Sequence, residues 1–209
     1  MFDRNIRSLG VACNWRESNL NIFYLDKDPS IAASLQCNSH VVKMLLESAQ
    51  MLSTAHRVLD GKEQIIVSSK GRKNKYWFHP KLERILYKPT HVNHPCNVWI
   101  RQSIPNYKWL YEHFVALAIE FEYRFEKVHM SFEKLNHVLA RYPENIPRCA
   151  EFTDPPLAMK NQPQCIDESD PVGSYRKFYC TKDFNMTWTK RPIPDWYSNS
   201  SVDSETKYS

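Results

Sequence analysis

The sequence predicts a mainly α fold, a single domain of packed helices with a minor β-hairpin or strand element. Residues 38–60 show helical periodicity, and most of their side chains are apolar. Residues 105–127 place apolar side chains at helical spacing, as in a helix with one face in a core. Residues 64–78 look like two extended segments around a basic turn. We therefore expect a domain built around helix 38–60 packed on helix 105–127.

The long segment 38–60 carries its polar residues on one line. They are spaced three or four residues apart, which stacks them on one helix face: His40, Lys43, Glu47, Gln50 and Thr54. A surface helix has a broad polar face, whereas this pattern is the reverse and predicts a core helix with one polar groove. Burying a His, a Lys and a Glu there is costly unless they are paired, so the groove indicates a site. Asn38 or Ser39 is expected to cap this helix, and Gly61 to end it.

Local signals predict the elements on either side of the long helix. Residues 20–25 (LNIFYL) are short, apolar and aromatic, which predicts a buried strand. Asp28 followed by Pro29 is a start signal for a short helix. The turn within 64–78 is crowded with cations, which are Lys70, Arg72, Lys73 and Lys75. It is either a loop that contacts phosphates or the solvated tip of a hairpin.

The second half of the chain predicts further helices separated by irregular segments. The expected helices cover residues 105–127, 131–141 and 171–179, the last capped by Asp170. Residues 82–97 and 143–171 are expected to be irregular. Over the whole chain, we expect an N-terminal extension at 1–19, the globular domain at 20–196 and a disordered tail at 197–209.

Composition narrows the classes of function. The formal net charge is +5 and the pI about 8.8, which permits a nucleic-acid partner without requiring one. With four Gly, neither a phosphate-binding loop nor a dinucleotide-binding fingerprint can be placed, which argues against P-loop and Rossmann enzymes. The 6 Trp, 11 Tyr and 10 Phe can fill a core or offer faces on which bases stack.

Cysteine and histidine spacing gives little sign of a metal. The six Cys form no CxxC pair, so we expect no zinc ribbon. The sequence shows neither a signal peptide nor a run of membrane-spanning length, so we expect a cytoplasmic chain with reduced thiols and no membrane partner. His91 and His94 are spaced like two metal ligands, but no matching acid or Cys accompanies them. We expect them to serve in hydrogen bonding and capping, and we predict no metal and no cofactor.

Glu47 is the leading catalytic candidate. A Glu beside a His and a Lys can act as a general base or stabilise a cation, which assigns His40 and Lys43 to the same site. A lysine in such a place can also attack a sugar C1′ carbon and form a Schiff base. The other residues assigned to the polar groove are Gln50, Thr54, His91 and His94. The alternative is a buried network that only ties the helix to its neighbours.

Two further clusters mix aromatic rings with hydrogen-bonding groups, as nucleic-acid contacts do. The residues assigned to that role are Trp99, Arg101, Asn106, Tyr175, Arg176 and Lys177. The alternative is that the aromatic rings belong to the core. Arg101 in particular needs a partner, because it is a long cation beside Trp99 in an otherwise apolar turn.

Four stretches carry a family resemblance: CNSHVVKMLLESAQMLSTAHRVLDG, YKPTHVNHPCNVWIRQSIPNYKWL, DPVGSYRKFY and RPIPDW. They resemble a family of small, uncharacterised phage and bacterial proteins over most of residues 20–196. Members of that family begin near the NIFYLD segment, so residues 1–19 look like an addition. The resemblance implies an intracellular protein, phage-encoded in a bacterial host.

The order of elements also resembles the phage endonuclease V type of pyrimidine-dimer DNA glycosylase. In that family a helix carries a His and, seven residues later, the catalytic Glu, which is the separation of His40 and Glu47. A turn with a His precedes a long helix, as His94 does here, and an aromatic and basic segment like 175–179 follows. The resemblance implies the fold of that glycosylase family and the activity of a DNA glycosylase/AP lyase. Its partner would be duplex DNA, in which a damaged or modified base is reached by bending or flipping.

The resemblance also implies roles for single residues. Glu47 would be the catalytic carboxylate and His40 a substrate contact, while the basic turn and Arg101 would hold phosphates. That family uses an N-terminal α-amine, exposed by Met removal, as its nucleophile. Here Phe2 follows Met1, so Met removal is not expected. Lys43, one helical turn from Glu47, is the expected substitute.

Other classes of function stay open beside this one. A non-catalytic nucleic-acid-binding phage accessory protein would bind DNA in a salt-sensitive way that survives Glu47→Gln. An enzyme acting on nucleotides or small phosphorylated metabolites would have a closed pocket and no long basic surface. In a structural or partner-binding protein, the polar line would be a buried network.

Overall fold

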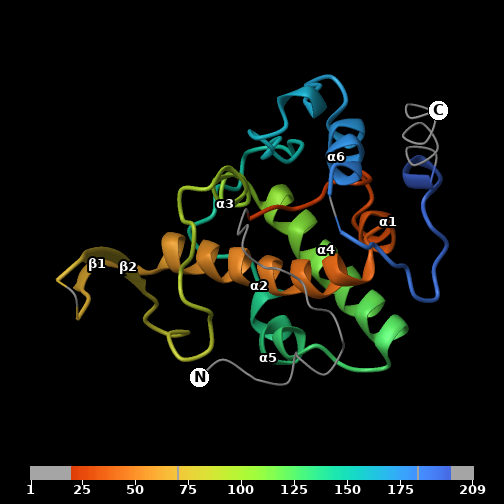
Figure 1. Ribbon diagram of the computed structural model, residues 1–209. Coiled ribbons are helices and arrows are strands. Elements are labelled where there is room, and N and C mark those ends of the chain that lie inside the picture. The colour runs from red at the N-terminus through yellow and green to blue at the C-terminus, as the bar shows by residue number, and fades with distance from the viewer. Residues whose placement is uncertain (1–19, 70, 183, 199–209) are drawn as a thin grey trace.

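Helix α2 (Asn38–Asp60) lies at the centre of the molecule, and helix α4 (Ile104–Phe125) crosses it (Figure 1). The computed structural model describes residues 20–69, 71–182 and 184–198. Both helices contribute fully buried side chains to one core cluster, among them Leu45, Leu52, Leu110, Phe114 and Leu117. The predicted mainly helical fold built on these two helices is confirmed.

The start of α2 differs by one residue from the expectation. Cys37, rather than Asn38 or Ser39, is the N-cap residue, and its backbone N–H donates to the hydroxyl of Tyr179 at 2.8 Å. Asn38 instead uses its side chain to bind the C-terminal segment, donating to the Thr187 hydroxyl at 3.0 Å. Contacts with distant residues therefore replace the local cap that the sequence suggested.

Four shorter helices surround this pair: α1 (Pro29–Ser34), α3 (Pro95–Trp99), α5 (Met130–Leu139) and α6 (Pro171–Cys180). In each, a capping side chain accepts a hydrogen bond from the first turn, and the four caps are Asp28, His94, His129 and Asp170. The predicted caps at Asp28 and Asp170, and the capping role of His94, are confirmed. α2 ends as predicted at Gly61, where a Cβ would lie 2.2 Å from the Arg57 carbonyl oxygen.

The predicted strand over residues 20–25 is wrong. These residues are buried but irregular, and they join no sheet in the described part of the chain. The Asn21 side-chain oxygen accepts hydrogen bonds from the backbone N–H groups of Ile22 at 2.7 Å and Phe23 at 3.2 Å. Phe23 is turned to a φ of 52°. A local side-chain turn therefore takes the backbone donors that a strand would offer to a neighbour.

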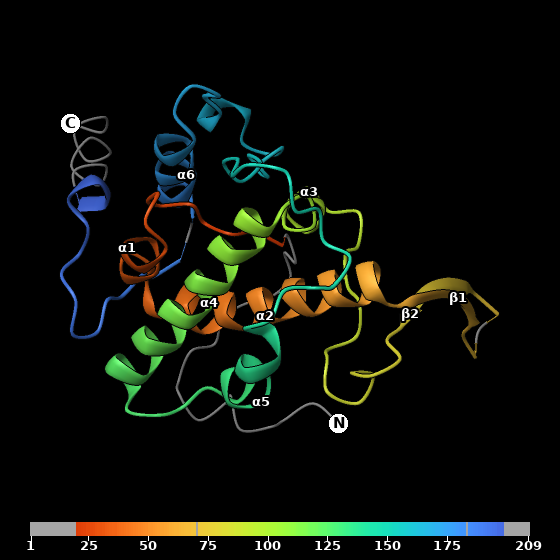
Figure 2. The same ribbon diagram turned by 180° about the vertical axis from the view of Figure 1, so that it is seen from behind.

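The predicted hairpin is confirmed. β1 (Lys62–Val67) and β2 (Lys73–Phe78) pair in antiparallel fashion and form the sheet of the described chain. The hairpin extends away from the body, beyond the C-terminal end of α2 (Figure 2). Every residue of β1 is exposed.

Arg57 on α2 fixes the base of this hairpin. Its buried guanidinium donates to the carbonyl oxygen of Trp77 in β2 at 3.0 Å and pairs with the Glu83 carboxylate. It also donates to the carbonyl oxygens of Tyr87 at 2.7 Å and Leu86 at 3.1 Å. One buried cation thus links α2, β2 and the loop that follows β2.

The C-terminal part of the described chain packs on the N-terminal part. Residues 143–171 are irregular apart from a short 3-10 turn, η2 (Pro163–Cys165), and the α6 start. Trp188 donates its indole N–H to the Leu35 carbonyl oxygen at 2.9 Å, and its ring lies 5.0 Å from that of Tyr197. Residues 197 and 198 belong to a helical turn, so the packed chain continues past the predicted boundary at 196.

Three of the expectations fall on residues that the structure does not describe. These are the extension at 1–19, the place of Lys70 in the basic turn, and the tail from 199 to 209. In the described residues, no helix is both long enough and apolar enough to cross a membrane.

Candidate functional site

Lys43 and Glu47 form an ion pair on α2. The Lys43 Nζ lies 3.5 Å from Glu47 Oε1, and the side chains are 21% and 13% exposed. Residues four apart on a helix are neighbours, so the predicted spacing does bring these two together. Gln50 is half-buried on the next turn. The pair is mostly shielded from water, which strengthens its interaction relative to a surface pair.

Glu47 has an acid-base character unlike that of an exposed glutamate. Burial raises the pKa of its carboxyl group, and this outweighs the opposing effects of Lys43 and of the backbone N–H of Asn21. That N–H donates to Glu47 Oε2 at 3.4 Å. A carboxyl group with a raised pKa can take up and release a proton closer to neutral pH.

His40 lies in an aromatic cluster. Its ring centre is 4.5 Å from that of Phe23, 4.9 Å from Tyr179 and 5.3 Å from Phe184. Burial, with smaller effects of Lys43 and Lys182, lowers the pKa of His40 to about 3. The ring is therefore neutral at pH 7, and it packs on these aromatic rings rather than on the Glu47 carboxylate.

The loop 88–94 is held in place by Thr54 on α2 and Asn97 on α3. The Thr54 hydroxyl accepts from the backbone N–H of Thr90 at 3.2 Å. Asn97 donates its amide to the carbonyl oxygens of Thr90 and His91, each at 3.0 Å. These bonds hold His91 at a φ of 45°, which is a rare conformation for a residue with a side chain. Thr54 therefore positions the loop rather than lining an open groove.

Arg101 completes the support of this loop. Its Nη2 donates to the carbonyl oxygen of Val92 at 2.9 Å, and its Nη1 is buried without a partner. Burial lowers the pKa of its guanidinium group. Arg101 thus supports the loop through the protein backbone, and its expected role in holding phosphates stays a prediction.

His94 connects the loop to the first turn of α3. Its Nδ1 accepts from the backbone N–H of Cys96 at 3.3 Å. Burial raises the pKa of the Cys96 thiol to about 12, and the charge of Glu47 acts in the same direction, so this turn lies near Glu47. Burial lowers the pKa of His94, with smaller effects of His91 and Lys160. His91 and Lys160 are exposed at the rim of this region.

Three residues expected to contact nucleic acid lie in the core instead. Trp99 donates its indole N–H to the Thr153 carbonyl oxygen at 2.9 Å, and Asn106 donates to the Trp99 carbonyl oxygen at 3.1 Å. The Tyr175 hydroxyl donates to the Pro156 carbonyl oxygen at 2.7 Å. Since all three are buried, they cannot stack on or bind a base. Aromatic spacing alone does not separate a core stripe from a stacking platform.

The remaining cations expected to bind nucleic acid reach the surface. Arg176 is half-buried and pairs with Asp26 at 3.3 Å, while Lys177 is exposed. In the hairpin, Arg72, Lys73 and Lys75 are all exposed. Both interpretations of the basic turn, a phosphate contact and a solvated tip, require this exposure.

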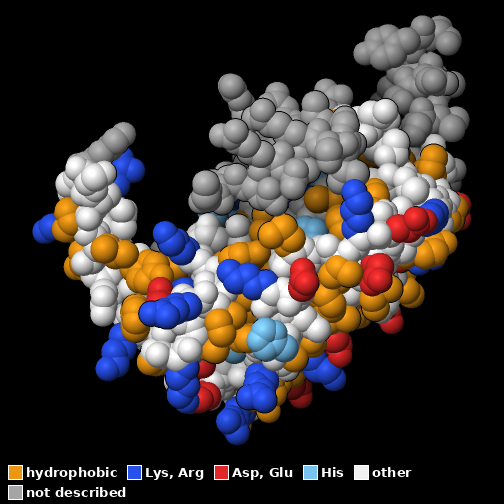
Figure 3. Space-filling model, turned by 90° about the horizontal axis from the view of Figure 1, so that it is seen from below, with side chains coloured by type: hydrophobic (Ala, Val, Ile, Leu, Met, Phe, Trp, Pro, Cys, Tyr) orange, Lys and Arg blue, Asp and Glu red, His pale blue; other side chains and the backbone are white. Residues whose placement is uncertain are grey.

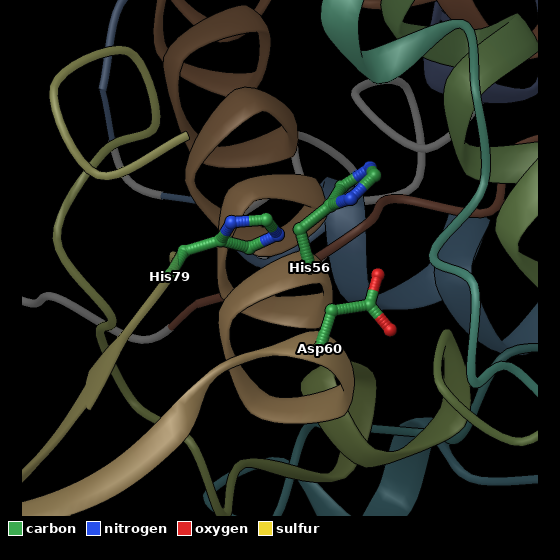
Figure 4. A group of neighbouring side chains, drawn as sticks. All are labelled: His56, Asp60 and His79. Atoms are coloured by element: carbon green, nitrogen blue, oxygen red, sulfur yellow. The ribbon is translucent and has the colours of Figure 1, made fainter. Parts of the chain in front are cut away.

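A second group of titratable side chains lies at the base of the hairpin (Figure 4). His56 and Asp60 come from the end of α2, and His79 follows β2. One ligand atom from each lies within 4.8 Å of the others, so the group could hold a metal ion by distance. The sequence offered one signal, the spacing of His56 and Asp60 by one helical turn, but His79 joins them only through the hairpin.

The proton positions in this group do not suit a metal ion. The Tyr107 hydroxyl donates to the Leu139 carbonyl oxygen at 3.0 Å, so it accepts from Nε2 of His56 at 2.9 Å and leaves His56 Nδ1 with a lone pair. In His79, Nδ1 accepts from two backbone N–H groups of the next turn, at 3.1 and 3.2 Å. Its proton is therefore on Nε2, which has no lone pair for a metal. The group fits a hydrogen-bonded cluster with His79 as the donor.

Comparison of the chain with protein-family models, with curated proteins and with solved structures found no match.

Proposed function

We propose that this chain is a DNA-processing enzyme of the glycosylase/AP lyase kind, acting on a damaged or modified base. The observation that carries the proposal is the shielded pair of a primary amine and a carboxyl group with a raised pKa, Lys43 and Glu47. Lyase chemistry at a sugar C1′ needs an amine nucleophile and a group that moves its protons. The likeness in element order to the endonuclease V type of glycosylase supports the same assignment.

The reaction would begin with a proton transfer within the Lys43–Glu47 pair. Glu47 takes the proton of the Lys43 ammonium, and the neutral amine then attacks C1′. The N–C1′ bond forms as the C1′–base bond breaks, and the base leaves with the electron pair and takes up the proton released by the nitrogen. The sugar ring then opens to give a Schiff base, with the ring oxygen accepting the proton held by Glu47.

Exposed cations near the pair would hold the DNA backbone. Lys160 is exposed near His94, and Lys177 is exposed on α6. Asn21 connects Glu47 to the irregular segment that contains Ala158. Its backbone N–H binds Glu47, and its side-chain amide donates to the Ala158 carbonyl oxygen at 3.4 Å. Phosphate contacts by such cations position a duplex without reading its sequence.

The exposed cationic hairpin favours a second candidate, a nucleic-acid-binding accessory protein without catalysis. Arg72, Lys73 and Lys75 are exposed on the β1–β2 hairpin, which extends away from the body beyond the end of α2 (Figure 1), so they serve binding whether or not the Lys43–Glu47 pair is reactive. In this candidate, Glu47→Gln leaves DNA binding and its salt dependence unchanged, and no covalent adduct forms.

The test is borohydride trapping on labelled duplex DNA that contains an abasic site or a cyclobutane dimer. Glu47→Gln and Lys43→Arg should each lower adduct formation at least about 100-fold, as expected for loss of an acid-base group or a nucleophile. Matched controls are available on α4, where Lys108 and Glu112 form an exposed pair at the same spacing, 3.6 Å apart. Lys108→Arg and Glu112→Gln should trap like the wild type. Full trapping by Lys43→Arg would exclude Lys43 as the nucleophile.

A further inference from the structure

The β1–β2 hairpin presents large apolar side chains to solvent. Ile65 is 66% exposed, Ile66 48% and Val67 60%. A two-stranded hairpin alone is at best marginally stable in water, and exposed apolar side chains in one place mark a contact surface. Figure 3 shows the hairpin as an arm that stands away from the body, with Lys and Arg side chains on and beside it. This arm has no covering element among the described residues.

The arm is fixed at its base, so its direction is set. Arg57 binds the Trp77 carbonyl oxygen and the Glu83 carboxylate, and the Tyr76 hydroxyl donates to the same carboxylate. The cluster of His56, Asp60 and His79 lies at the same end (Figure 4). A ribbon held in this way presents its outer half in one orientation to a partner.

The pairing register divides the ribbon into two different faces. Ile65 pairs with Lys75 and Val67 with Lys73, so one face carries an apolar edge beside a cationic edge. On the opposite face, Ile66 pairs with Asn74, which carries no charge. The Lys75 side chain is 65% exposed and pairs with Glu63 at 2.8 Å. Glu63 adds a carboxylate to this first face, and Lys62 adds a cation to the opposite face near the base of the ribbon. In the outer half of the ribbon, the first face combines Lys73 and Lys75 with Ile65 and Val67, whereas Ile66 and Asn74 of the opposite face carry no charge.

We propose that the β1–β2 hairpin enters the major groove of duplex DNA as a two-stranded ribbon. Lys73 and Lys75 would contact phosphates, and Ile65 and Val67 would face the base edges. The major groove admits a two-stranded β-ribbon, and apolar side chains contact thymine methyl groups there. A second copy of the chain is disfavoured as the occupant, since paired ribbons would bring their lysines together. The choice of DNA as the anion rests on the proposed function.

The charge test measures DNA affinity against salt by fluorescence anisotropy, with the full chain and a labelled duplex. Each phosphate contact adds about 0.9 to the magnitude of the log–log salt slope, so Lys73→Ala/Lys75→Ala should lower it by about 1.8. Lys108→Ala/Lys127→Ala removes the same charge from exposed sites elsewhere and should leave the slope near the wild-type value. An unchanged slope in the hairpin variant, or no binding by the wild type at low salt, would overturn the proposal.

The groove test uses two neighbouring residues of one type. Ile65→Thr should weaken duplex binding several-fold, whereas Ile66→Thr, on the opposite face, should bind like the wild type. Threonine keeps a high strand propensity, so both variants retain the hairpin. Equal affinities of the two variants would refute the assigned face. A dimer in sedimentation that Ile65→Thr abolishes would establish a second copy as the occupant instead.

Glu47→Gln, measured in parallel, separates this inference from the proposed function. The hairpin variants could lower the salt slope while neither the wild type nor Glu47→Gln forms an adduct. That result would support the binding of the hairpin to DNA and refute the glycosylase/lyase proposal. Adducts could instead form and depend on Glu47 while the hairpin variants bind DNA like the wild type. That result would support the glycosylase/lyase proposal and refute the binding of the hairpin in the major groove.

Discussion

The backbone N–H of Asn21 donates a hydrogen bond to Oε2 of Glu47 at 3.4 Å, although the two residues are 26 positions apart in the chain. This contact places the buried segment 20–25 directly against the proposed acid-base group. The Asn21 nitrogen is an amide within the chain and is not nucleophilic. Lys43, at 3.5 Å, is therefore the primary amine that the structure places beside Glu47.

A chain cut to begin at Asn21 should gain a second nucleophile. Its α-amine would occupy the place of the present amide nitrogen, next to Glu47. We expect this change to restore borohydride trapping in the Lys43→Arg variant, and Glu47→Gln to abolish it again. Mass spectrometry of the adduct would locate the bond on the new N-terminus. An adduct on another lysine would contradict the prediction.

Acid should destabilise the fold through buried neutral histidines. His113 is fully buried on α4, and burial lowers its pKa to about 3. The unfolded chain then binds a proton that the folded chain does not, so stability is complete above pH 6.5 and falls between there and pH 3. At pH 5 this one group lowers the free energy of unfolding by about 2 kcal/mol relative to pH 7.

The measurement for His113 is the free energy of unfolding in urea at pH 7 and pH 5. In His113→Asn, the free energies of unfolding at pH 7 and pH 5 should differ by about 2 kcal/mol less than they do in the wild type. His137, exposed on α5, supplies the control, and His137→Asn should keep the wild-type difference. The same difference in both variants would show that His113 does not cause the acid sensitivity.

Replacing the buried cation at the hairpin base should be costly even when the charge is kept. Arg57→Lys retains the positive charge but loses the planar fork that serves Trp77, Leu86 and Glu83 together. We expect a loss of about 3 kcal/mol in the free energy of unfolding, because buried acceptors are left unpaired. Arg84→Lys, at an exposed position in the same loop, should change it by less than about 0.5 kcal/mol.

The strained residue of the loop 88–94 should distinguish glycine from alanine. His91 has a φ of 45°, which glycine adopts freely and alanine does not. His91→Gly should therefore be more stable than His91→Ala by about 1 kcal/mol, measured by urea unfolding. Both variants lose the contact of the imidazole with the Thr90 hydroxyl, so that loss cancels in the comparison. Equal stability would mean that the loop relaxes without Asn97 holding it.

Periodicity and capping predicted much of this fold, while contacts between distant residues escaped prediction. The 38–60 helix follows from its apolar spacing, and Asp28 and Asp170 follow from local capping chemistry. The segment 20–25 was misassigned because one side chain, Asn21, competes for its backbone donors. Hydrophobicity alone could not show this.

Contacts between distant residues also limited what the sequence could predict about the candidate site. The neighbourhood of Lys43 and Glu47 follows from a spacing of four residues on a helix, so it was predictable. Trp99, Asn106 and Tyr175 bind Thr153, Trp99 and Pro156, which depends on where an irregular loop folds back. The partnership of His79 with His56 and Asp60 likewise arises only when the hairpin closes.

The packing of the C-terminal segment on the start of α2 has a consequence for synthesis on the ribosome. The backbone N–H of Asn38 donates to the Thr187 carbonyl oxygen at 2.8 Å, and Trp188 binds the Leu35 carbonyl oxygen. Both partners emerge from the exit tunnel about 150 residues after the groups they satisfy. These two contacts at the start of the central helix can therefore form only after Trp188 has left the tunnel, later than the packing of α4 on α2.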